Sequence, residues 1–241
     1  MPDIGFFCAG AAQAALRDPI ARFEERHGVR ILLDFGPVGR MKQRILAGEA
    51  VQVVVLSRPA IADLAAQGRV VASTVSDIGT TGVGIAVRKG AARPDVSTAD
   101  GLRRTLLAAA SLSYGDPAHG DSSGIHFASV IERLAIREAL AGKTILAASG
   151  VDVVDRVARG EAELGATQSS VIRANAGVEL AGMLPGDLQH HTTYAIALAA
   201  GLEGAAGEWA SGLLAHLTSP EVRQHYERFG LAQAPETGPR G

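Results

Sequence analysis

Residues 116–124, Asp-Pro-Ala-His-Gly-Asp-Ser-Ser-Gly, gather the side chains of this 241-residue chain that are best suited to hold a small anion. The residues after them have helical spacing, with a predicted core face of Ile125, Ala128, Ile131 and Leu134. The N–H groups at a helix start lack partners within the helix and attract anions. We therefore predict that Ser122, Ser123 and Gly124 contact an anionic ligand, although plain helix capping would use the same residues.

Other polar residues occupy equivalent places in the predicted pattern. The strand-like run 110–114 puts the loop at the carboxyl end of a strand, where open α/β sheets bind ligands. Gln168 and Ser169 follow the predicted strand 163–167 in the same way, and both can hydrogen-bond a ligand oxygen. Tyr194, on a predicted strand at 191–199, can donate its hydroxyl to the ligand or pack at a hinge.

Two arginines point to the class of ligand. Arg40 and Arg58 each follow a strand-end loop in the first part of the chain. A guanidinium fork matches a carboxylate in a two-point contact, whereas tetrahedral oxyanions can be held by neutral dipoles alone. An arginine in the site therefore favours an organic acid. The alternative for each is a solvated arginine at a helix start.

Proton transfer is a further possibility, because histidine titrates near neutral pH. His119 in the loop is our candidate catalytic residue if the protein is an isomerase. Asp116 or Cys8 could serve if their surroundings shift their pKa, while His126 reads as a surface residue. The pair His190-His191 predicts no metal site, because adjacent residues of a strand point to opposite faces.

Composition narrows the function classes. The formal net charge of −2 argues against a nucleic-acid partner, which usually selects a basic face. A single cysteine allows no internal disulfide, and no apolar run is long enough to span a bilayer. No nucleotide-binding loop or zinc-like spacing occurs, so we expect neither a cofactor nor a metal. Without a leader before the strand-like residues 4–9, we expect a cytoplasmic protein, or a periplasmic one if a signal was removed.

Strands and helices alternate along the chain, which is typical of the α/β class. A glycine-rich strand near 80–87 and a strand near 191–197 look like crossings between two lobes. We expect residues 1–81 and 195–241 to form lobe 1 and residues 82–194 to form lobe 2. Two lobes joined by two crossing segments predict a ligand cleft between them and a hinge motion.

Several motifs in this order resemble the type II periplasmic solute-binding proteins, in the branch similar to molybdate-binding proteins. They are Ala9-Gly-Ala, Phe35-Gly-Pro-Val-Gly39, Gly48-Glu-Ala-Val-Gln-Val-Val-Val-Leu-Ser57, the loop 116–124, and Arg159-Gly-Glu-Ala-Glu-Leu-Gly-Ala166. The resemblance implies two α/β lobes with the ligand between them. It also implies that the loops at Gly10, Val38 and Ser57 face the 116–124 loop.

The molybdate-binding relatives use hydroxyl groups after the first two strands, and this chain has none there. Gly10, Ala11, Val38 and Gly39 offer backbone N–H groups instead. The branch also contains aconitate-isomerase-like members, which the loop 116–124 and the segment 180–188 resemble.

Three hypotheses follow from the residues and the resemblance. The first is capture of a small organic anion, a di- or tricarboxylate, with delivery to a membrane transporter if the protein is exported. The second is an aconitate-isomerase-like enzyme on the same scaffold. The third is molybdate or tungstate binding for an ABC transporter. Oligomeric state and ligand identity are not encoded in these patterns.

Overall fold

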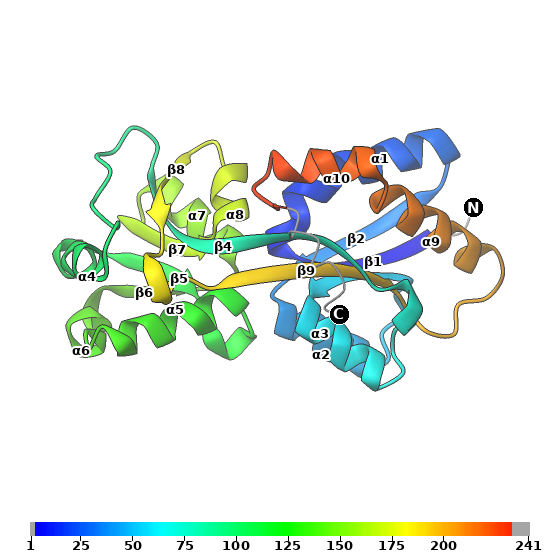
Figure 1. Ribbon diagram of the computed structural model, residues 1–241, viewed down its shortest axis with the longest axis horizontal. Coiled ribbons are helices and arrows are strands. Elements are labelled where there is room, and N and C mark those ends of the chain that lie inside the picture. The colour runs from blue at the N-terminus through cyan, green and yellow to red at the C-terminus, as the bar shows by residue number, and fades with distance from the viewer. Residues whose placement is uncertain (1–2, 233–241) are drawn as a thin grey trace, which may run out of the picture. The chain divides into compact units, whose positions relative to one another are not determined.

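A computed structural model describes residues 3–232 and divides into two compact units. Unit 1 holds the chain up to Thr81 and from Thr192 onward, and unit 2 holds Gly82–His191. The chain passes between the units on two strands, β4 (Ser76–Arg88) and β9 (His191–Leu198), which Figure 1 labels. Residues 192–194, which we expected in lobe 2, are in unit 1, where β9 pairs with a unit 1 strand from Tyr194 onward.

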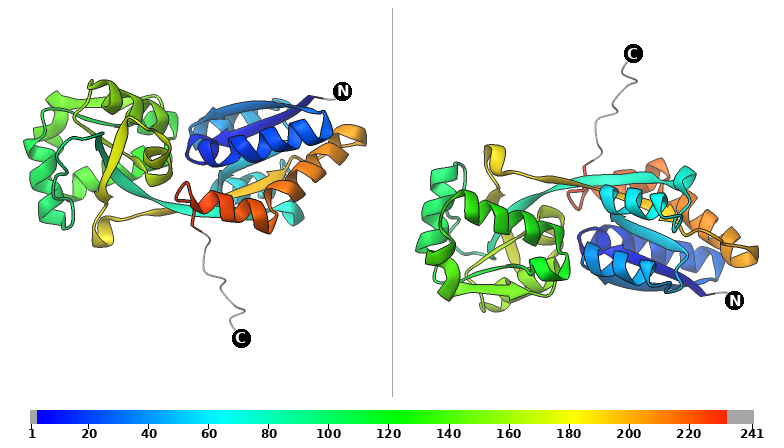
Figure 2. Two further views of the ribbon diagram at one scale, coloured as in Figure 1. Left: turned by 90° about the horizontal axis from the view of Figure 1, so that it is seen from above. Right: turned by 90° about the horizontal axis from the view of Figure 1, so that it is seen from below.

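The sheet of unit 1 has the order β2-β1-β3-β9-β4. Its remaining strands are β1 (Asp3–Ala9), β2 (Arg30–Gly36) and β3 (Val53–Ser57). Every residue of β3 is buried, as expected for a strand covered on both faces. Helices supply that cover: α1 (Gln13–His27), α2 (Val38–Leu46), α3 (Arg58–Ala66), α9 (Gly204–Leu217) and α10 (Pro220–Glu227). In Figures 1 and 2, α1, α9 and α10 lie over one face of these strands, and α2 and α3 lie over the other.

Parallel pairing brings the loops of unit 1 to one edge of its sheet. β1 is parallel to β2 and β3, with Ala9 opposite Gly36 and Cys8 opposite Val55. The chain continues from these ends into the short helix η1 (Gly10–Ala12), into α2 and into α3. Three helix starts therefore follow the carboxyl ends of three neighbouring strands, where α/β sheets bind ligands.

Unit 2 repeats the arrangement around β7 (Leu164–Gln168). The order is β4-β7-β5-β6, with β5 (Leu112–Gly115) parallel to both β6 (Thr144–Ala147) and β7. A strand absent from the sequence prediction, β8 (Val178–Met183), pairs with β4. The longer helices are α4 (Ala99–Ala108), α5 (Ser122–Arg133) and α7 (Gly150–Arg159). The short helices of unit 2 are α6 (Arg137–Leu140), α8 (Ser169–Ala174), η3 (Pro117–His119), η4 (Ala141–Lys143) and η5 (Gly186–Leu188). Unit 1 contains a further short helix, η2 (Ala72–Thr74).

Helix α5 is present as expected, but its buried face differs from the prediction. The Ile125 side chain, which we placed in the core, is 51% exposed. Ile131 is buried as predicted, and the other buried residues are Ser123, Gly124, Phe127 and Val130. This stripe also has helical spacing, and it is selected because Gly124 packs directly on the backbone of Gly115 in β5.

Candidate functional site

The start of α5 is held by a buried hydrogen-bond network. Asp121 caps the helix, and its Oδ1 accepts the Gly124 N–H at 2.8 Å and the Ser123 hydroxyl at 2.6 Å. The Ser123 Oγ also lies 3.3 Å from Thr167 Oγ1 in β7. Ser123 is only 2% exposed, so its hydroxyl fixes the loop to the sheet. The Ser123 hydroxyl therefore supports the loop, and the backbone N–H of Ser123 is the group that is left for a ligand.

Ser122 carries a hydroxyl and a backbone N–H that take no part in this network. Its side chain is partly exposed, and its hydroxyl has no hydrogen-bond partner among residues 3–232. The backbone N–H groups of Ser122 and Ser123 also lack acceptors within that range. One hydroxyl and two N–H groups at a helix start can bind one carboxylate or a similar anion.

Gly124 has a packing role that the sequence did not indicate. A Cβ built on Gly124 would lie 1.8 Å from the carbonyl oxygen of Gly115. The space beside Gly124 is therefore filled by β5, and a ligand cannot occupy it. Gly115 is equally constrained, because a Cβ there would lie 2.4 Å from the Asp121 carboxyl carbon.

The residues after β7 lie at the same edge of the unit 2 sheet. Tyr114 is opposite Ala166 in the parallel pair, so the carboxyl ends of β5 and β7 are adjacent. Gln168 and Ser169 follow there, and both side chains are buried. Thr167, which the sequence analysis missed, is fully buried and bonds to Ser123. Alternation along β7 could have suggested it as an inward-facing polar residue.

In unit 1, the start of α2 resembles that of α5 but carries a cation. No side chain caps this helix, and its first internal bond runs from the Met41 N–H to the Pro37 carbonyl. The N–H groups of Val38, Gly39 and Arg40 therefore lack acceptors within residues 3–232. The Arg40 side chain is exposed and forms no ion pair in the described part of the chain. A cation at a helix N-terminus is unfavourable without an anion, so this arrangement favours a negatively charged ligand.

Arg58 differs from Arg40 in having a partner. Its guanidinium forms an ion pair with Asp77 on β4. Ser57, just before it, is buried and lies opposite Tyr194 in the antiparallel pairing of β3 with β9. Tyr194 is 1% exposed and belongs to the core of unit 1. Gly10 and Ala11 lie in η1, at the same edge of the sheet.

The candidate proton-transfer groups have distinct surroundings. His119 is exposed in η3, and its Nδ1 lies 3.8 Å from Asp116 Oδ2. Cys8 is fully buried, and burial raises the pKa of its thiol, so it stays protonated and is a poor base. The His126 Nε2 lies 2.8 Å from the Leu188 carbonyl oxygen, within hydrogen-bond distance.

The structure therefore groups the predicted residues by unit. His119, Ser122, Ser123, Gly124, Gln168 and Ser169 lie around the carboxyl edge of β5 and β7 in unit 2. The carboxyl edge of β1, β2 and β3 in unit 1 carries Gly10, Ala11, Val38, Gly39, Arg40, Ser57, Arg58 and Tyr194.

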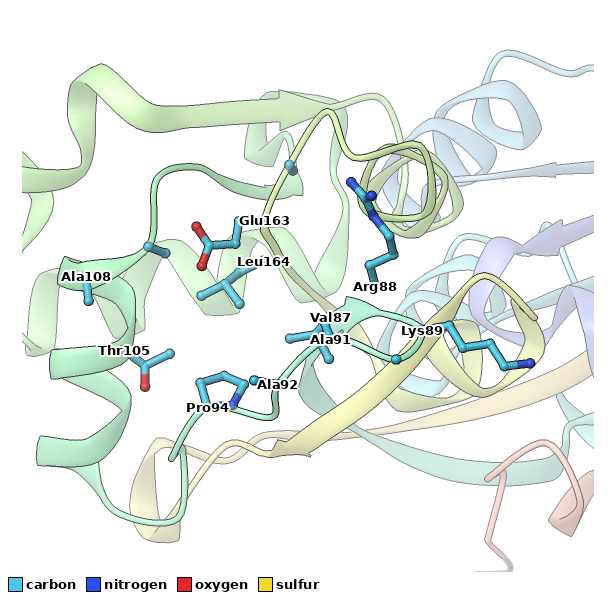
Figure 3. A pocket seen from close by; sticks show the side chains of 13 residues that line it. Val87, Arg88, Lys89, Ala91, Ala92, Pro94, Thr105, Ala108, Glu163 and Leu164 are labelled. Atoms are coloured by element: carbon cyan, nitrogen blue, oxygen red, sulfur yellow. The ribbon is translucent and has the colours of Figure 1, made fainter.

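A separate cavity lies elsewhere in unit 2. It has a volume of about 630 Å³, and its wall includes Val87, Pro94, Thr105 and Leu164 (Figure 3). Leu164 begins β7, whereas Gln168 ends it, so the cavity lies at the opposite edge of the sheet from the start of α5. It is mostly apolar and contains none of the predicted ligand contacts.

Among residues 3–232, no set of three or more His, Cys, Asp or Glu side chains is arranged to hold a metal ion. No helix among these residues combines the length and apolar character that a membrane crossing requires.

Comparison with known families decides the class of protein. The family described as bacterial extracellular solute-binding protein matches residues 4–232. The chain belongs to this family. It is 30% identical over 234 residues to an aconitate isomerase of a Pseudomonas species, a match that covers 94% of this chain and 86% of that protein.

Solved structures show the same fold at lower identity. The periplasmic molybdate-binding protein of Azotobacter vinelandii has a TM-score of 0.75 and 15% identity, over 96% of this chain and 100% of that one. PEB3 of Campylobacter jejuni with bound L-phospholactate has a TM-score of 0.69 and 17% identity, over 96% and 100%. The fold is thus the two-lobed type II fold of periplasmic binding proteins.

Proposed function

We propose that this solute-binding protein captures a small organic di- or tricarboxylate, and that a compound of the aconitate type is its ligand. The observation that carries the proposal is the 30% identity to an aconitate isomerase over nearly the whole chain. Aconitate is an unsaturated tricarboxylate, so its recognition requires at least two separate anion subsites.

The two helix starts supply such subsites. At α5, the Ser122 hydroxyl and the N–H groups of Ser122 and Ser123 would hold one carboxylate. At α2, the N–H groups of Val38 and Gly39, together with the Arg40 guanidinium, would hold another. We propose that each subsite binds one carboxylate group of the ligand.

A carboxylate explains the residue types better than molybdate does. The loops after β1 and β2 provide Gly10, Ala11 and Ala12, then Pro37, Val38 and Gly39, none of which has a hydroxyl. A free arginine is well matched to a planar carboxylate. Binding of molybdate or tungstate remains the competing proposal, and the fold of the Azotobacter protein is the observation behind it.

The ligand class is tested by thermal unfolding with trans-aconitate, citrate, molybdate and tungstate. A ligand selective for the folded state raises the midpoint, by an amount equivalent to about 2.7 kcal/mol at a hundredfold excess over Kd. We expect a shift with the carboxylates. A shift with molybdate or tungstate alone would refute the carboxylate proposal.

Two substitutions test the subsites. Arg40→Gln and Ser122→Ala should each weaken trans-aconitate binding, by about tenfold to a hundredfold for the arginine, since a charge-assisted contact is lost. Arg26→Gln is the matched control, because Arg26 is exposed, is in the last turn of α1 and forms no ion pair within residues 3–232. Isothermal titration calorimetry gives the three affinities. Equal affinities would remove Arg40 and Ser122 from the site.

Isomerisation is the second candidate function, and the relationship to aconitate isomerase is what favours it. The reaction breaks a C–H bond on the saturated carbon next to the double bond. The double bond then shifts, and a proton is added at its far end, with no net oxidation. We propose His119 as the group that removes and returns the proton, with Asp116 Oδ2 3.8 Å from its Nδ1.

Proton NMR of trans-aconitate in deuterated water distinguishes a receptor from an enzyme. An isomerase would convert the isomers with deuterium incorporation, and His119→Gln would lose conversion but keep binding. His27→Gln, an exposed histidine in α1 of unit 1, serves as the control. Binding without conversion or exchange would leave a receptor. Membership of an extracellular family supports export, so we also propose a periplasmic location and, for a receptor, a membrane transporter as partner.

A further inference from the structure

Helix α5 does more than present an anion subsite, because it also holds the segment that leads into β9. This segment, 187–190, immediately precedes the strand on which the chain leaves unit 2 for unit 1. Near the end of α5, the Arg133 Nη1 donates to the Asp187 carbonyl at 2.9 Å, and the two side chains form an ion pair. Near its middle, the His126 Nε2 lies 2.8 Å from the Leu188 carbonyl.

The same segment is joined to the other crossing strand, β4, by a side chain. Gln189 accepts the Val83 N–H at 3.0 Å and donates to the Val83 carbonyl at 3.0 Å. This amide thereby binds both backbone groups of Val83, whose carbonyl also accepts the Leu184 N–H at 3.0 Å. Gly82 makes room for it, because a Cβ there would lie 3.2 Å from the Gln189 side-chain amide.

We infer that α5 couples the anion subsite to the two crossing strands, with His126 as the positioning residue. The inference rests on the proposed function, because it assumes that an anion binds at Ser122 and Ser123. An anion at the helix start binds the N–H groups of the first turn of α5, and His126 follows that turn directly, so an anion that shifts the helix start also shifts His126. His126 and Arg133 transmit any such movement to the segment 187–190, and Gln189 passes it to Val83.

A second histidine makes this connection sensitive to pH. The rings of His126 and His190 are 5.0 Å apart. Partial burial lowers the pKa of His190, with smaller contributions from His126 and His191. The other charged groups on these elements are Arg133 of α5 and Asp187 of η5, which are paired with each other, and Glu132 of α5, which is paired with Arg137. Protonation of His190 in acid places a positive charge beside the His126 ring, whose Nε2 hydrogen-bonds the Leu188 carbonyl, and this charge weakens the hold of α5 on the segment 187–190.

The first test compares variants of His126 by calorimetry with trans-aconitate. His126→Ala should lower the affinity by about tenfold, in the usual range for coupling between two sites. His126→Gln should restore most of it, because its amide N–H can still donate to the Leu188 carbonyl. Ser129→Ala is the control on the same helix, since the Ser129 hydroxyl bonds only to the helix backbone. Wild-type affinity in His126→Ala would overturn the inference.

The second test reports on the coupling itself. In amide hydrogen exchange, trans-aconitate should raise the protection of the Val83 and Gln189 amides in the wild type and in His126→Gln. It should leave them unchanged in His126→Ala. A purely structural role for His126 would lower protection in His126→Ala without abolishing the response to ligand, and that result would contradict the proposal.

Amide hydrogen exchange without ligand tests this inference independently of the proposed function. If trans-aconitate does not bind the wild type, the proposed function fails, and exchange without ligand decides the inference. Protection of the Val83 amide should then fall about tenfold between about pH 7.5 and about pH 5.5 in the wild type. It should stay constant in His126→Gln. Equal pH dependence in the two proteins would overturn the inference.

Discussion

Three small residues determine how the 116–124 loop meets the sheet. Gly115 and Gly124 allow β5 and α5 to touch backbone to backbone, and Asp121 closes the first turn of the helix. This contact fixes the direction in which the Ser122 N–H and hydroxyl point. The anion subsite therefore depends on residues that do not themselves offer any group to a ligand.

Gly124→Ala should be strongly destabilising, because its Cβ would lie 1.8 Å from the Gly115 carbonyl oxygen. Overpacking of this kind costs about 1–3 kcal/mol, and separation of α5 from β5 would also displace the subsite. Urea unfolding measures the loss, and calorimetry measures the affinity. Gly142→Ala is the matched control, because no atom lies within 4 Å of a Cβ at that position. Equal stability of the two variants would show that α5 and β5 are not in backbone contact.

At the scale of elements, α2 and α5 start in the same way but are stabilised differently. Asp121 caps α5, whereas Pro37 precedes α2 and no side chain caps it. Arg40 adds a positive charge where the helix dipole is already positive. Glu49 attracts Arg40 electrostatically and offsets part of the resulting cost. In the proposed site, a bound carboxylate would remove the rest.

Arg40→Glu should consequently stabilise the ligand-free protein while it removes binding. A carboxylate in the first turn of a helix is favourable by about 0.3–1 kcal/mol, and the original cation was unfavourable by a similar amount. Thermal unfolding at low ionic strength checks the gain, and salt should reduce it. Arg26→Glu, in the last turn of α1, should have the opposite effect on stability. A loss of stability in Arg40→Glu would show that Arg40 has a structural partner.

At the scale of the whole molecule, each unit contains a histidine that the fold holds in its neutral form. Burial lowers the pKa of His190 in unit 2. Burial also lowers the pKa of His225 in unit 1, assisted by Arg22 and Arg228, and its Nε2 is buried without a partner among residues 3–232. An unfolded chain takes up a proton at these sites more readily than the folded one does.

Acid should therefore destabilise the protein. Because both folded pKa values lie below the ordinary value of 6.5, the unfolded state binds more protons in the window between them. Stability then rises with pH across this window, and it is lost as pH falls from 6.5 through the folded pKa values. The melting temperature against pH should have a shallower slope in His190→Asn/His225→Asn.

Much of this molecule follows from local patterns in the sequence. Alternating strand and helix signals predict the α/β class, and the loop-to-helix transition at Ser122 is correctly anticipated. The two crossing segments were also identifiable, because glycine-rich β4 and the strand containing Tyr194 interrupt the regular alternation. These features depend on neighbours in the chain, so they can be recognised without the fold.

Contacts between distant segments could not be deduced in this way. The sequence alone determined that an anion-attracting helix start follows β5, and it made Ser123 and Gly124 look like ligand contacts. Tertiary structure decided that Ser123 faces Thr167 and that Gly124 faces Gly115, leaving Ser122 as the available hydroxyl. It also gave the two arginines different surroundings, because Arg58 forms an ion pair with Asp77 and Arg40 does not. The physical reason is that a hydroxyl or a guanidinium binds whichever partner the fold brings near, and spacing along the chain does not specify that partner.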